Sequence, residues 1–478
     1  MKYTYITTTL PYVNDKPHLG FALEIVQADV YARFHSLLEE KVIFNTGTDE
    51  HGLKIFQKAR EQNLDPLTYC TQYAEFFKNL RSSLNLSWTH FIRTTDKHHI
   101  LSAQEFWKRC DANGDIYKKK YRVRYCVGCE LEKTDSELVN NRCPLHPNRE
   151  LEIIEEENYF FRFSQYQKKL LDLYKKNPDF VQPRFRMHEI TQFVERGLED
   201  FSISRLKKKM PWGIAVPNDP DHVMYVWFDA LINYISTIGW PQDEKQFSCF
   251  WPGIQVAGKD NLRQQSAMWQ AMLMSAKLPP SKKIFIHGFI TSEGKKMSKS
   301  IGNVVDPVEL VHRFGVDPVR YYLLREIPSL DDGDFSEQRF QELYDSDLAN
   351  ELGNLVSRLC TLGEKLKIEI KKTQKSTSST DPILLSLMLS IDSFSFSTAL
   401  ESIWKKIKKI NLSLDEDKPW SLTSEKAQPV VETLLDSLHE VGIELTPFLP
   451  QTAETIKKYT KGKITKHKPL FMRLSSLS

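Results

Sequence analysis

The stretch Pro17-His18-Leu19-Gly20 joins two segments of different periodicity near the N-terminus of the chain. It follows a β-branched and aromatic run over residues 3–9, which predicts a strand, and it precedes a helix-like stretch over residues 22–38. We therefore expect His18 and Gly20 at a strand-to-helix turn, where free backbone N–H groups and the helix dipole favour an anion. This turn predicts a nucleotide-binding α/β fold.

A second polar segment, Lys296-Met297-Ser298-Lys299-Ser300, lies far downstream, after the apolar run 284–290. It carries two lysines on a loop that contains serine and glycine. Brought next to His18, these lysines would bracket a triphosphate from the opposite side, because cations stabilise the charge that develops on the phosphates during transfer. The two segments together predict one fold and one nucleotide.

The α/β pattern is interrupted in the middle of the chain. We expect an α/β fold in which a Rossmann-type nucleotide-binding domain is split by a zinc-knuckle insertion and followed by an α-helical bundle. Its parts are predicted at 1–112 (first half of the Rossmann domain), 113–222 (insertion), 223–290 (second half, with apolar runs at 224–228, 253–258 and 284–290), 291–345 (the loop with the two lysines and a connecting region) and 346–478 (helices, with a polar loop at 371–381).

Four potential metal ligands lie in two close pairs inside the insertion, Cys126-Val127-Gly128-Cys129 and Cys143-Pro144-Leu145-His146. Two such pairs joined by a short loop are what a tetrahedral zinc site needs. Three thiolates and one imidazole leave no coordination position open, so we predict one structural Zn²⁺. The alternative is a pair of unrelated turns with free cysteines.

The overall composition excludes several classes of protein. The chain has 478 residues, of which 41% are hydrophobic, and a formal net charge of +3, which is too small to indicate nucleic-acid binding by itself. A run of about 18 apolar residues and an N-terminal signal-peptide pattern are both lacking. Three of the seven cysteines are grouped, which favours a reducing compartment and a metal rather than disulfides. We expect a cytoplasmic protein that does not enter a membrane.

The two phosphate-binding segments resemble the HIGH and KMSKS signatures of class I aminoacyl-tRNA synthetases, and nearly the whole chain is similar to the methionyl-tRNA synthetase family. The similarity extends to the segments Thr9-Leu10-Pro11-Tyr12, 47–52, 225–230, 258–260, 353–358 and Asp417-Lys418-Pro419-Trp420. A single zinc knuckle fits the single-metal form of that family. The resemblance implies that ATP, with Mg²⁺, activates L-methionine to methionyl-adenylate and pyrophosphate, and that methionine then passes to the 3′-terminal adenosine of tRNA(Met).

The family's functional residues carry over onto matching positions. The resemblance implies a methionine pocket of Leu10, Tyr12, Asp49, Trp227 and Tyr234, in which Asp49 pairs with the α-ammonium group. It implies ATP contacts by His18, Gly20, Gly258, Asp260, Lys296, Met297, Ser298, Lys299 and Ser300, with His18, Lys296 and Lys299 as the catalytic residues. It also implies contact of the 291–345 region with the tRNA stem and anticodon binding by Asn354, Arg358 and Trp420, since splayed RNA bases are read by stacking and by edge hydrogen bonds.

Four positions depart from the usual pattern of the family. Phe21 replaces the second histidine of the HIGH signature, Leu231 stands where proline is common, and Asn261 and Gln265 replace an aliphatic residue and a histidine. These departures leave open two alternatives: a synthetase-like protein that binds tRNA without charging it, and a class I synthetase for another hydrophobic amino acid. The sequence after Lys468 is too short for the C-terminal barrel of dimeric members, so we expect a monomer.

Overall fold

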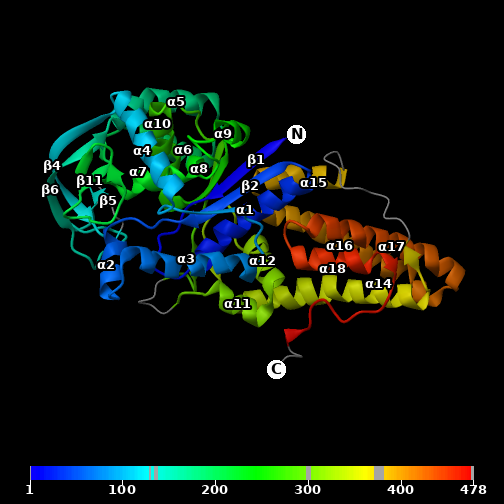
Figure 1. Ribbon diagram of the computed structural model, residues 1–478. Helices are drawn as coiled ribbons and strands as arrows, with labels where there is room; N and C mark the ends of the chain where they lie inside the picture. The colour runs from blue at the N-terminus through cyan, green and yellow to red at the C-terminus, as the bar shows by residue number, and fades with distance from the viewer. Residues whose placement is uncertain (1, 129–130, 134–137, 298–302, 371–381, 475–478) are drawn as a thin grey trace.

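A six-stranded parallel sheet lies at the centre of the protein, with the strand order β3-β2-β1-β12-β13-β7 (Figure 1). The computed structural model describes residues 2–128, 131–133, 138–297, 303–370 and 382–474. The strands are β1 (Tyr3–Thr8), β2 (Lys41–Thr48), β3 (His90–Arg93), β7 (Val181–Gln182), β12 (Ile254–Gly258) and β13 (Lys283–His287). The strand order reverses between β1 and β12, and ligands of such sheets bind at the carboxyl ends beside the reversal. The predicted Rossmann-type α/β class is confirmed.

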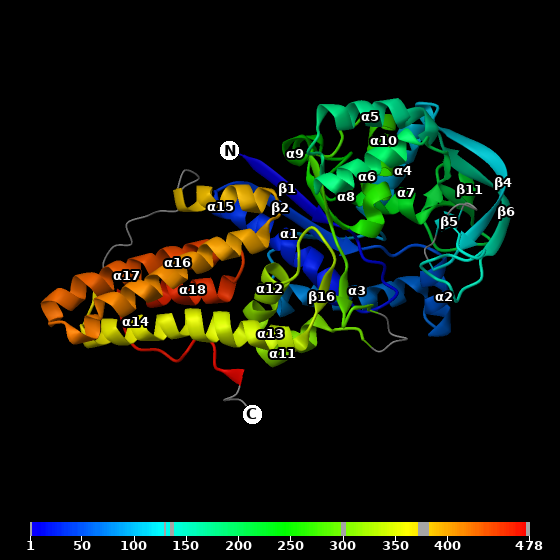
Figure 2. The same ribbon diagram turned by 180° about the vertical axis from the view of Figure 1, so that it is seen from behind.

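Each face of the sheet is covered by a separate hydrophobic core, as expected for parallel strands. Helix α1 (Leu19–Leu37) contributes to one core, which continues into the C-terminal helices. The other core joins the sheet to the insertion, through residues such as Phe106, Phe161 and Trp269. The sheet is therefore held between the two other parts of the molecule, which lie at opposite ends in both views (Figures 1 and 2).

The segment between β3 and β12 forms most of the insertion. Its antiparallel sheet has the order β5-β4-β6-β8 and contains β4 (Ile116–Cys126), β5 (Leu131–Lys133), β6 (Glu152–Phe161) and β8 (Phe201–Ser202). The same segment also supplies β7, which pairs with β13 at the edge of the central sheet. The insertion is thus attached to the nucleotide-binding sheet by backbone hydrogen bonds as well as by side-chain packing.

The apolar run 224–228 is not a strand of the central sheet, contrary to the expectation that the α/β pattern resumes there. Strand β11 (Asp219–Met224) ends at the start of this run and pairs with two short strands of the insertion. Helix α7 (Val226–Ala230) then begins after Tyr225. The run is apolar because all of its residues but Trp227 are buried, and a short buried segment has no periodicity that separates a strand from a helix.

The C-terminal part is a helical bundle, as predicted. Its helices are α14 (Asn354–Lys365), α15 (Pro382–Asp392), α16 (Phe396–Asp417), α17 (Ser424–Leu445) and α18 (Pro450–Tyr459). The polar loop predicted at 371–381 falls outside the described residues. Among the helices that are described, none is long and apolar enough to cross a bilayer.

A fully buried arginine, Arg320, connects α1 to this bundle. Arg320 lies on α12 (Val316–Arg325), and its guanidinium forms an ion pair of 2.7 Å with Asp29 of α1. The same guanidinium donates to the backbone oxygens of Leu84, Pro447 and Phe448 at 3.1, 3.0 and 2.8 Å. Each of the three guanidinium nitrogens thereby has an acceptor, which is the condition under which a buried charge is tolerated.

Candidate active site

A cavity of about 500 Å³ opens at the carboxyl ends of β1, β2, β12 and β13. Residues from all the predicted substrate-binding segments line it together, although they are far apart in sequence. Of the residues predicted to contact methionine or ATP, the lining contains Leu10, Tyr12, His18, Gly20, Asp49, Trp227, Tyr234, Gly258, Asp260 and Met297. The four departures from the family pattern, Phe21, Leu231, Asn261 and Gln265, line the same cavity.

His18 is the N-cap of α1, and its ring closes the first turn of the helix. Its Nδ1 accepts a hydrogen bond of 3.1 Å from the backbone N–H of Gly20, so a neutral ring carries its proton on Nε2. A Cβ on residue 20 would lie 2.9 Å from the His18 ring, which explains the glycine. The expectation of free backbone N–H groups at this turn is wrong, because the N–H groups of Leu19 and Phe21 also have acceptors, Val305 O and His18 O. An anion here would depend on the His18 ring and the helix dipole instead.

Asp49 is held rigidly at the end of β2. Its backbone N–H donates to Pro11 O at 3.0 Å, and its carbonyl accepts from Val13 N–H at 3.2 Å. The side chain is buried at the cavity wall. The backbone of Asp49 forms an isolated β-bridge with that of Tyr12, another residue of the wall. A buried carboxylate with a fixed backbone is suited to bind a substrate cation.

Two supporting carboxylates next to Asp49 were not singled out from the sequence. The buried Glu50 accepts from Arg93 Nε at 2.7 Å, and His51 Nδ1 lies 2.9 Å from Asp229 Oδ2. Burial tends to raise the pKa of Asp229, but His51 and then His99 outweigh it and hold that pKa below its ordinary value. The contact between His51 and Asp229 joins segment 47–52 to segment 225–230. The two segments that contain the predicted methionine ligands Asp49 and Trp227 are thus fixed to each other.

Glu24 and His287 form a further polar pair in the cavity that sequence reasoning missed. Glu24 Oε1 accepts from the N–H and the hydroxyl of Thr9, at 2.7 and 2.6 Å, and Oε2 lies 2.9 Å from His287 Nε2. The other ring nitrogen, Nδ1, donates to Gly288 O at 2.7 Å. Burial lowers the pKa of His287, but the hydrogen bond and charge of Glu24 together raise it above its ordinary value. The only sequence feature that could have indicated this pair is the position of His287, a polar residue at the carboxyl end of β13.

The described start of the downstream lysine segment reaches the cavity. Strand β15 (Lys295–Lys296) pairs with β14 (Ile290–Ser292), and Met297, the next residue, lines the cavity. Val305, beyond the segment, accepts the hydrogen bond from the N–H of Leu19 at the start of α1. The described part of the second signature is thus close in space to the first. Ser298, Lys299 and Ser300 lie outside the described residues.

Phe21 occupies its position as a packing residue. Its ring meets Phe77 edge to face, with the centroids 5.5 Å apart. The side chain cannot donate a hydrogen bond to a phosphate or a ribose, so His18 alone of this signature offers an imidazole to the cavity.

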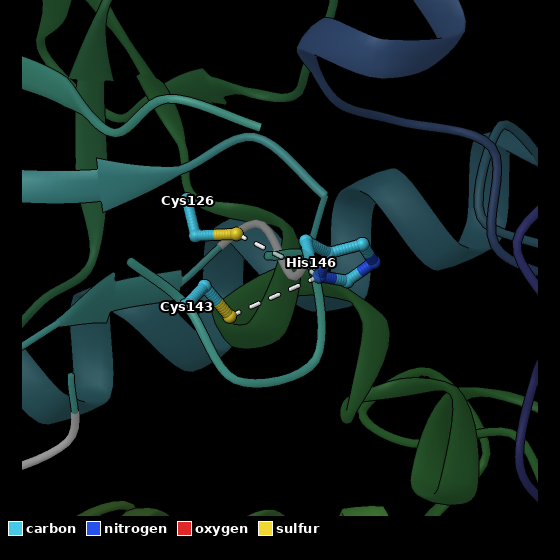
Figure 3. A group of neighbouring side chains, drawn as sticks. All are labelled: Cys126, Cys143 and His146. Carbon is cyan, nitrogen blue, oxygen red and sulfur yellow. Dashed lines mark hydrogen bonds between the residues drawn. The ribbon is translucent and has the colours of Figure 1, made fainter. Parts of the chain in front are cut away.

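Three of the four predicted zinc ligands converge in the insertion (Figure 3). His146 Nδ1 lies 3.7 Å from Cys126 Sγ and 3.9 Å from Cys143 Sγ. Ligand atoms around a tetrahedral zinc ion are separated by about 3.6–3.8 Å, so these residues fit zinc. The fourth, Cys129, lies outside the described residues. The knuckle adjoins the cavity, because Val127 packs against the same buried cluster as Tyr12 and Trp227, and Gly128 lines the cavity.

The predicted anticodon residues lie on the helical bundle, away from the cavity. Asn354 and Arg358 are one turn apart on α14, and the Arg358 guanidinium lies 5.5 Å from the centre of the Trp420 ring. Trp420 is 46% exposed, which is unusual for so large an apolar side chain. Arg358 also pairs with Asp415, which orients its planar group. An exposed ring beside an oriented guanidinium is suited to stacking and edge recognition of a base.

The chain was also compared with known proteins. A family model described as tRNA synthetases class I (M) matches residues 4–150 and 129–360. The methionine–tRNA ligase of Caldanaerobacter subterraneus subsp. tengcongensis is 43% identical over 463 residues, which cover 94% of this chain and 72% of the relative. The chain belongs to the class I methionyl-tRNA synthetases. A further family member, the methionine–tRNA ligase of Synechocystis sp., is 42% identical over 94% of this chain and 88% of its own length.

Solved structures of the family have the same fold over the whole chain. Mycobacterium tuberculosis methionyl-tRNA synthetase in complex with methionyl-adenylate matches with a TM-score of 0.91 and 35% identity, covering 99% of this chain and 100% of that one. The apo form of the same enzyme gives a TM-score of 0.84. The fold and family predicted from the sequence motifs are confirmed.

Proposed function

We propose that the chain joins L-methionine to tRNA(Met) in the two steps of its family, activation by ATP followed by transfer to the tRNA. The observation that carries this proposal is the convergence, in one cavity, of a buried carboxylate with aromatic side chains and of His18 with Gly258 and Asp260. The first group suits an amino acid with a long apolar side chain. The second suits a nucleotide. The family match favours methionine over the other hydrophobic amino acids.

In the activation step, the methionine carboxylate attacks the α-phosphorus of ATP in line, and pyrophosphate leaves. Asp49 would hold the α-ammonium group, while Tyr12 and Trp227 enclose the thioether by sulfur–aromatic contacts. His18 would donate from Nε2 to the phosphates, and Asp260 would accept from the ribose hydroxyls. Lys296 and Lys299 would stabilise the charge on the departing pyrophosphate. Mg²⁺ enters as part of the ATP complex.

In the transfer step, the 2′-hydroxyl of the terminal adenosine of the tRNA attacks the carbonyl carbon of the adenylate, and AMP leaves. The adenylate is already a mixed anhydride with a good leaving group, so neither step needs a nucleophile from the protein. Catalysis therefore consists of positioning and charge stabilisation. These are tasks that the cavity residues can perform without changing their covalent state.

The test is amino-acid-dependent ATP–pyrophosphate exchange on the purified chain, with leucine, cysteine and norleucine as comparisons. We expect exchange with methionine and much less with the others. Exchange supported only by another amino acid would replace methionine in the proposal. A folded protein without exchange for any amino acid would instead favour a tRNA-binding relative that does not charge tRNA.

For the knuckle, we propose that Cys129 completes the set Cys126, Cys143 and His146 around one structural Zn²⁺. The free energy of zinc binding to structural sites in small peptides is about 10–16 kcal/mol. A segment as short as this knuckle is therefore expected to fold only together with its metal. Because Val127 packs against the same buried cluster as Tyr12 and Trp227, loss of the ion should also disturb methionine binding.

Replacing Cys143 by serine is expected to remove the zinc. We expect the zinc content, measured by mass spectrometry on the purified protein, to fall from about one ion per chain to below about 0.1. Hydrogen exchange in β4 and β5 should accelerate, and the KM for methionine should rise. Cys249→Ser is the matched control, since Cys249 lies on α9 (Glu244–Phe250), away from the cluster. Full zinc content in Cys143→Ser protein would contradict the site.

For tRNA recognition, we propose that Asn354, Arg358 and Trp420 read the CAU anticodon. Trp420→Ala is expected to lower kcat/KM for tRNA(Met) by about 5- to 150-fold, because stacking of a base on an aromatic ring contributes about 1–3 kcal/mol. ATP–pyrophosphate exchange should stay unchanged, since the ring is remote from the cavity. Leu422→Ala, which removes another exposed apolar side chain nearby, serves as the control. Equal loss in both variants would argue for a structural effect.

The oligomeric state stays a prediction. We expect a monomer, and sedimentation velocity on the full chain would measure its mass directly.

A further inference from the structure

A short segment beyond α12 supports the hairpin that leads into the downstream lysine signature. The hairpin consists of β14 and β15, which are antiparallel, and it pairs Thr291 with Lys296. On its other edge, β14 pairs in parallel with β16 (Gly333–Phe335), so that Thr291 is also the partner of Asp334 (Figure 2). Strand β14 is thus the central strand of a three-stranded sheet, and we call residues 331–335 on its outer side the brace.

One carboxylate oxygen of the brace holds the turn of the hairpin. Glu293 and Gly294, the two residues between the strands, both have a positive φ, of 53° and 70°. Positive φ at both positions is typical of a type I′ turn, which glycine adopts readily and glutamate does not. Asp334 Oδ1 accepts from the backbone N–H of Gly294 at 2.8 Å and from Thr291 Oγ1 at 2.6 Å. The side chain of Asp334 therefore fixes both the turn and the strand that enters it.

A second aspartate of the brace, Asp332, connects the start of the hairpin to the loop after β12. Asp332 Oδ1 accepts from the backbone N–H of Phe289 at 2.9 Å, and its two oxygens lie 2.8 and 2.6 Å from Lys259 Nζ. Lys259 is flanked by Gly258 and Asp260, which line the cavity. These two residues are the ones proposed to meet the adenosine, so the brace joins the adenosine side of the site to the hairpin of the phosphate side.

The backbone of the brace also lies directly against the cavity wall. A Cβ on Gly288 would lie 2.2 Å from the backbone of Asp331, so only glycine allows this close approach. The N–H of Gly333 donates to Phe289 O at 2.9 Å, which complements the bond from the N–H of Phe289 to Asp332. Gly288 and Phe289 both line the cavity. A displacement of the brace would therefore move residues of the cavity itself.

We propose that Asp334 and Asp332 are positioning residues for the activation step, which hold the lysine hairpin at a fixed distance from the adenosine side of the cavity. The inference rests on the proposed function and deepens it. ATP spans both sides of the site, and charge develops on the departing pyrophosphate, so the two sides stabilise the transition state only if their spacing is fixed beforehand. Neither aspartate is among the residues that line the cavity. They act through the backbone of the hairpin and through Lys259.

The direction of the effect separates positioning from electrostatics. An aspartate close to a triphosphate repels it, so the loss of the negative charge alone should strengthen ATP binding. Loss of the hydrogen bonds that Asp334 accepts should instead release the turn, weaken ATP binding and slow activation. Because the two effects are opposite in sign, a decrease in activity toward ATP identifies the positioning role.

The experiment removes the acceptor at the turn with Asp334→Ala. We expect kcat/KM for ATP, measured by methionine-dependent ATP–pyrophosphate exchange, to fall by about five- to twentyfold, because two hydrogen bonds to one carboxylate oxygen are lost. The KM for methionine should change by less than about twofold, since the amino acid does not contact the hairpin. Transfer of methionine from preformed methionyl-adenylate to tRNA(Met), measured in a single turnover, should keep the wild-type rate, because pyrophosphate takes no part in that step. Asp334→Asn keeps an oxygen acceptor at the same place and should restore most of the activity.

Asp331→Ala is the matched control. Asp331 is an exposed aspartate of the same segment, and its side chain forms no hydrogen bond or ion pair with any of the residues that the structure describes. The control removes the same charge and should not lower kcat/KM for ATP. An unchanged or increased kcat/KM for ATP in folded Asp334→Ala protein would overturn the inference. An equal loss in the transfer step would also overturn it, because it would indicate a general disturbance of the fold.

A second variant, Asp332→Ala, releases the loop after β12 from the hairpin and is measured if Asp334→Ala does not fold. We expect the same pattern, a lower kcat/KM for ATP with an unchanged KM for methionine and an unchanged transfer rate. A wild-type kcat/KM for ATP in this variant would again overturn the inference. A wild-type chain without methionine-dependent exchange would contradict the proposed function itself, which is a different outcome from an active enzyme whose variants keep their activity toward ATP.

Discussion

Replacing Lys299 by alanine is expected to slow methionine-dependent ATP–pyrophosphate exchange by about 10²–10³-fold. This is the usual cost of removing one group that stabilises charge developing in a transition state. The affinity for methionine, measured by calorimetry without ATP, should change by less than about twofold, because Lys299 is proposed to contact the pyrophosphate and not the amino acid.

Lys295→Ala is the control for this prediction. Lys295 is an exposed lysine on β15, in the hairpin that leads into the same segment, so its loss removes the same charge. It should retain most of the wild-type rate. A similar decrease in both variants would indicate a general electrostatic effect rather than a specific contact to the leaving pyrophosphate.

The second large effect is expected at the opposite end of the cavity, for Asp49→Asn. The substitution keeps the shape of the side chain but removes the negative charge that would face the α-ammonium group of methionine. Truncating one partner of a buried charge pair costs about 2–5 kcal/mol, so kcat/KM for methionine should fall by at least about 30-fold. The loss should appear mainly in KM for methionine, with KM for ATP nearly unchanged.

Asp111→Asn carries the same change of charge on the exposed surface of α4 (Lys97–Ala112) and should behave like the wild type. Near-normal methionine affinity in Asp49→Asn would exclude the ion pair. The melting temperature of both variants should be compared, because Asp49 lies at the end of a central strand.

The sequence motifs were sufficient to predict the class of fold and ten of the residues that line the cavity. Gly258, Trp227 and Asp49 could be placed because each belongs to a short segment with a characteristic order of residues. The position of His18 followed from the change from strand to helix. Whether the backbone N–H groups beside His18 are free could not be predicted, because Val305, which accepts from one of them, lies in a distant segment.

Buried polar partners that are distant in sequence could not be predicted. Glu24 and His287 occur in apolar segments, and nothing in either segment indicates that their side chains meet. The same holds for Gln255 and Ser281, whose buried side chains are hydrogen-bonded to each other although they lie in separate segments. Helix α7 was missed for a different reason: Val226 and most of its neighbours are buried, so the hydrophobicity of the run shows no period.

The buried guanidinium of Arg320 has a consequence for how this enzyme could be recombined with its relatives. Three backbone oxygens from two distant stretches of chain meet on one cation, and Asp29 of the helix that begins beside His18 neutralises it. A chimaera with an exchanged bundle and a different backbone path near Pro447 and Phe448 would leave the Arg320 charge buried without these partners. Such a loss destabilises the fold by about 3–5 kcal/mol. The nucleotide-binding part and the helical bundle are therefore expected to be inherited together, with any viable crossover placed so that both sides of this junction come from one parent.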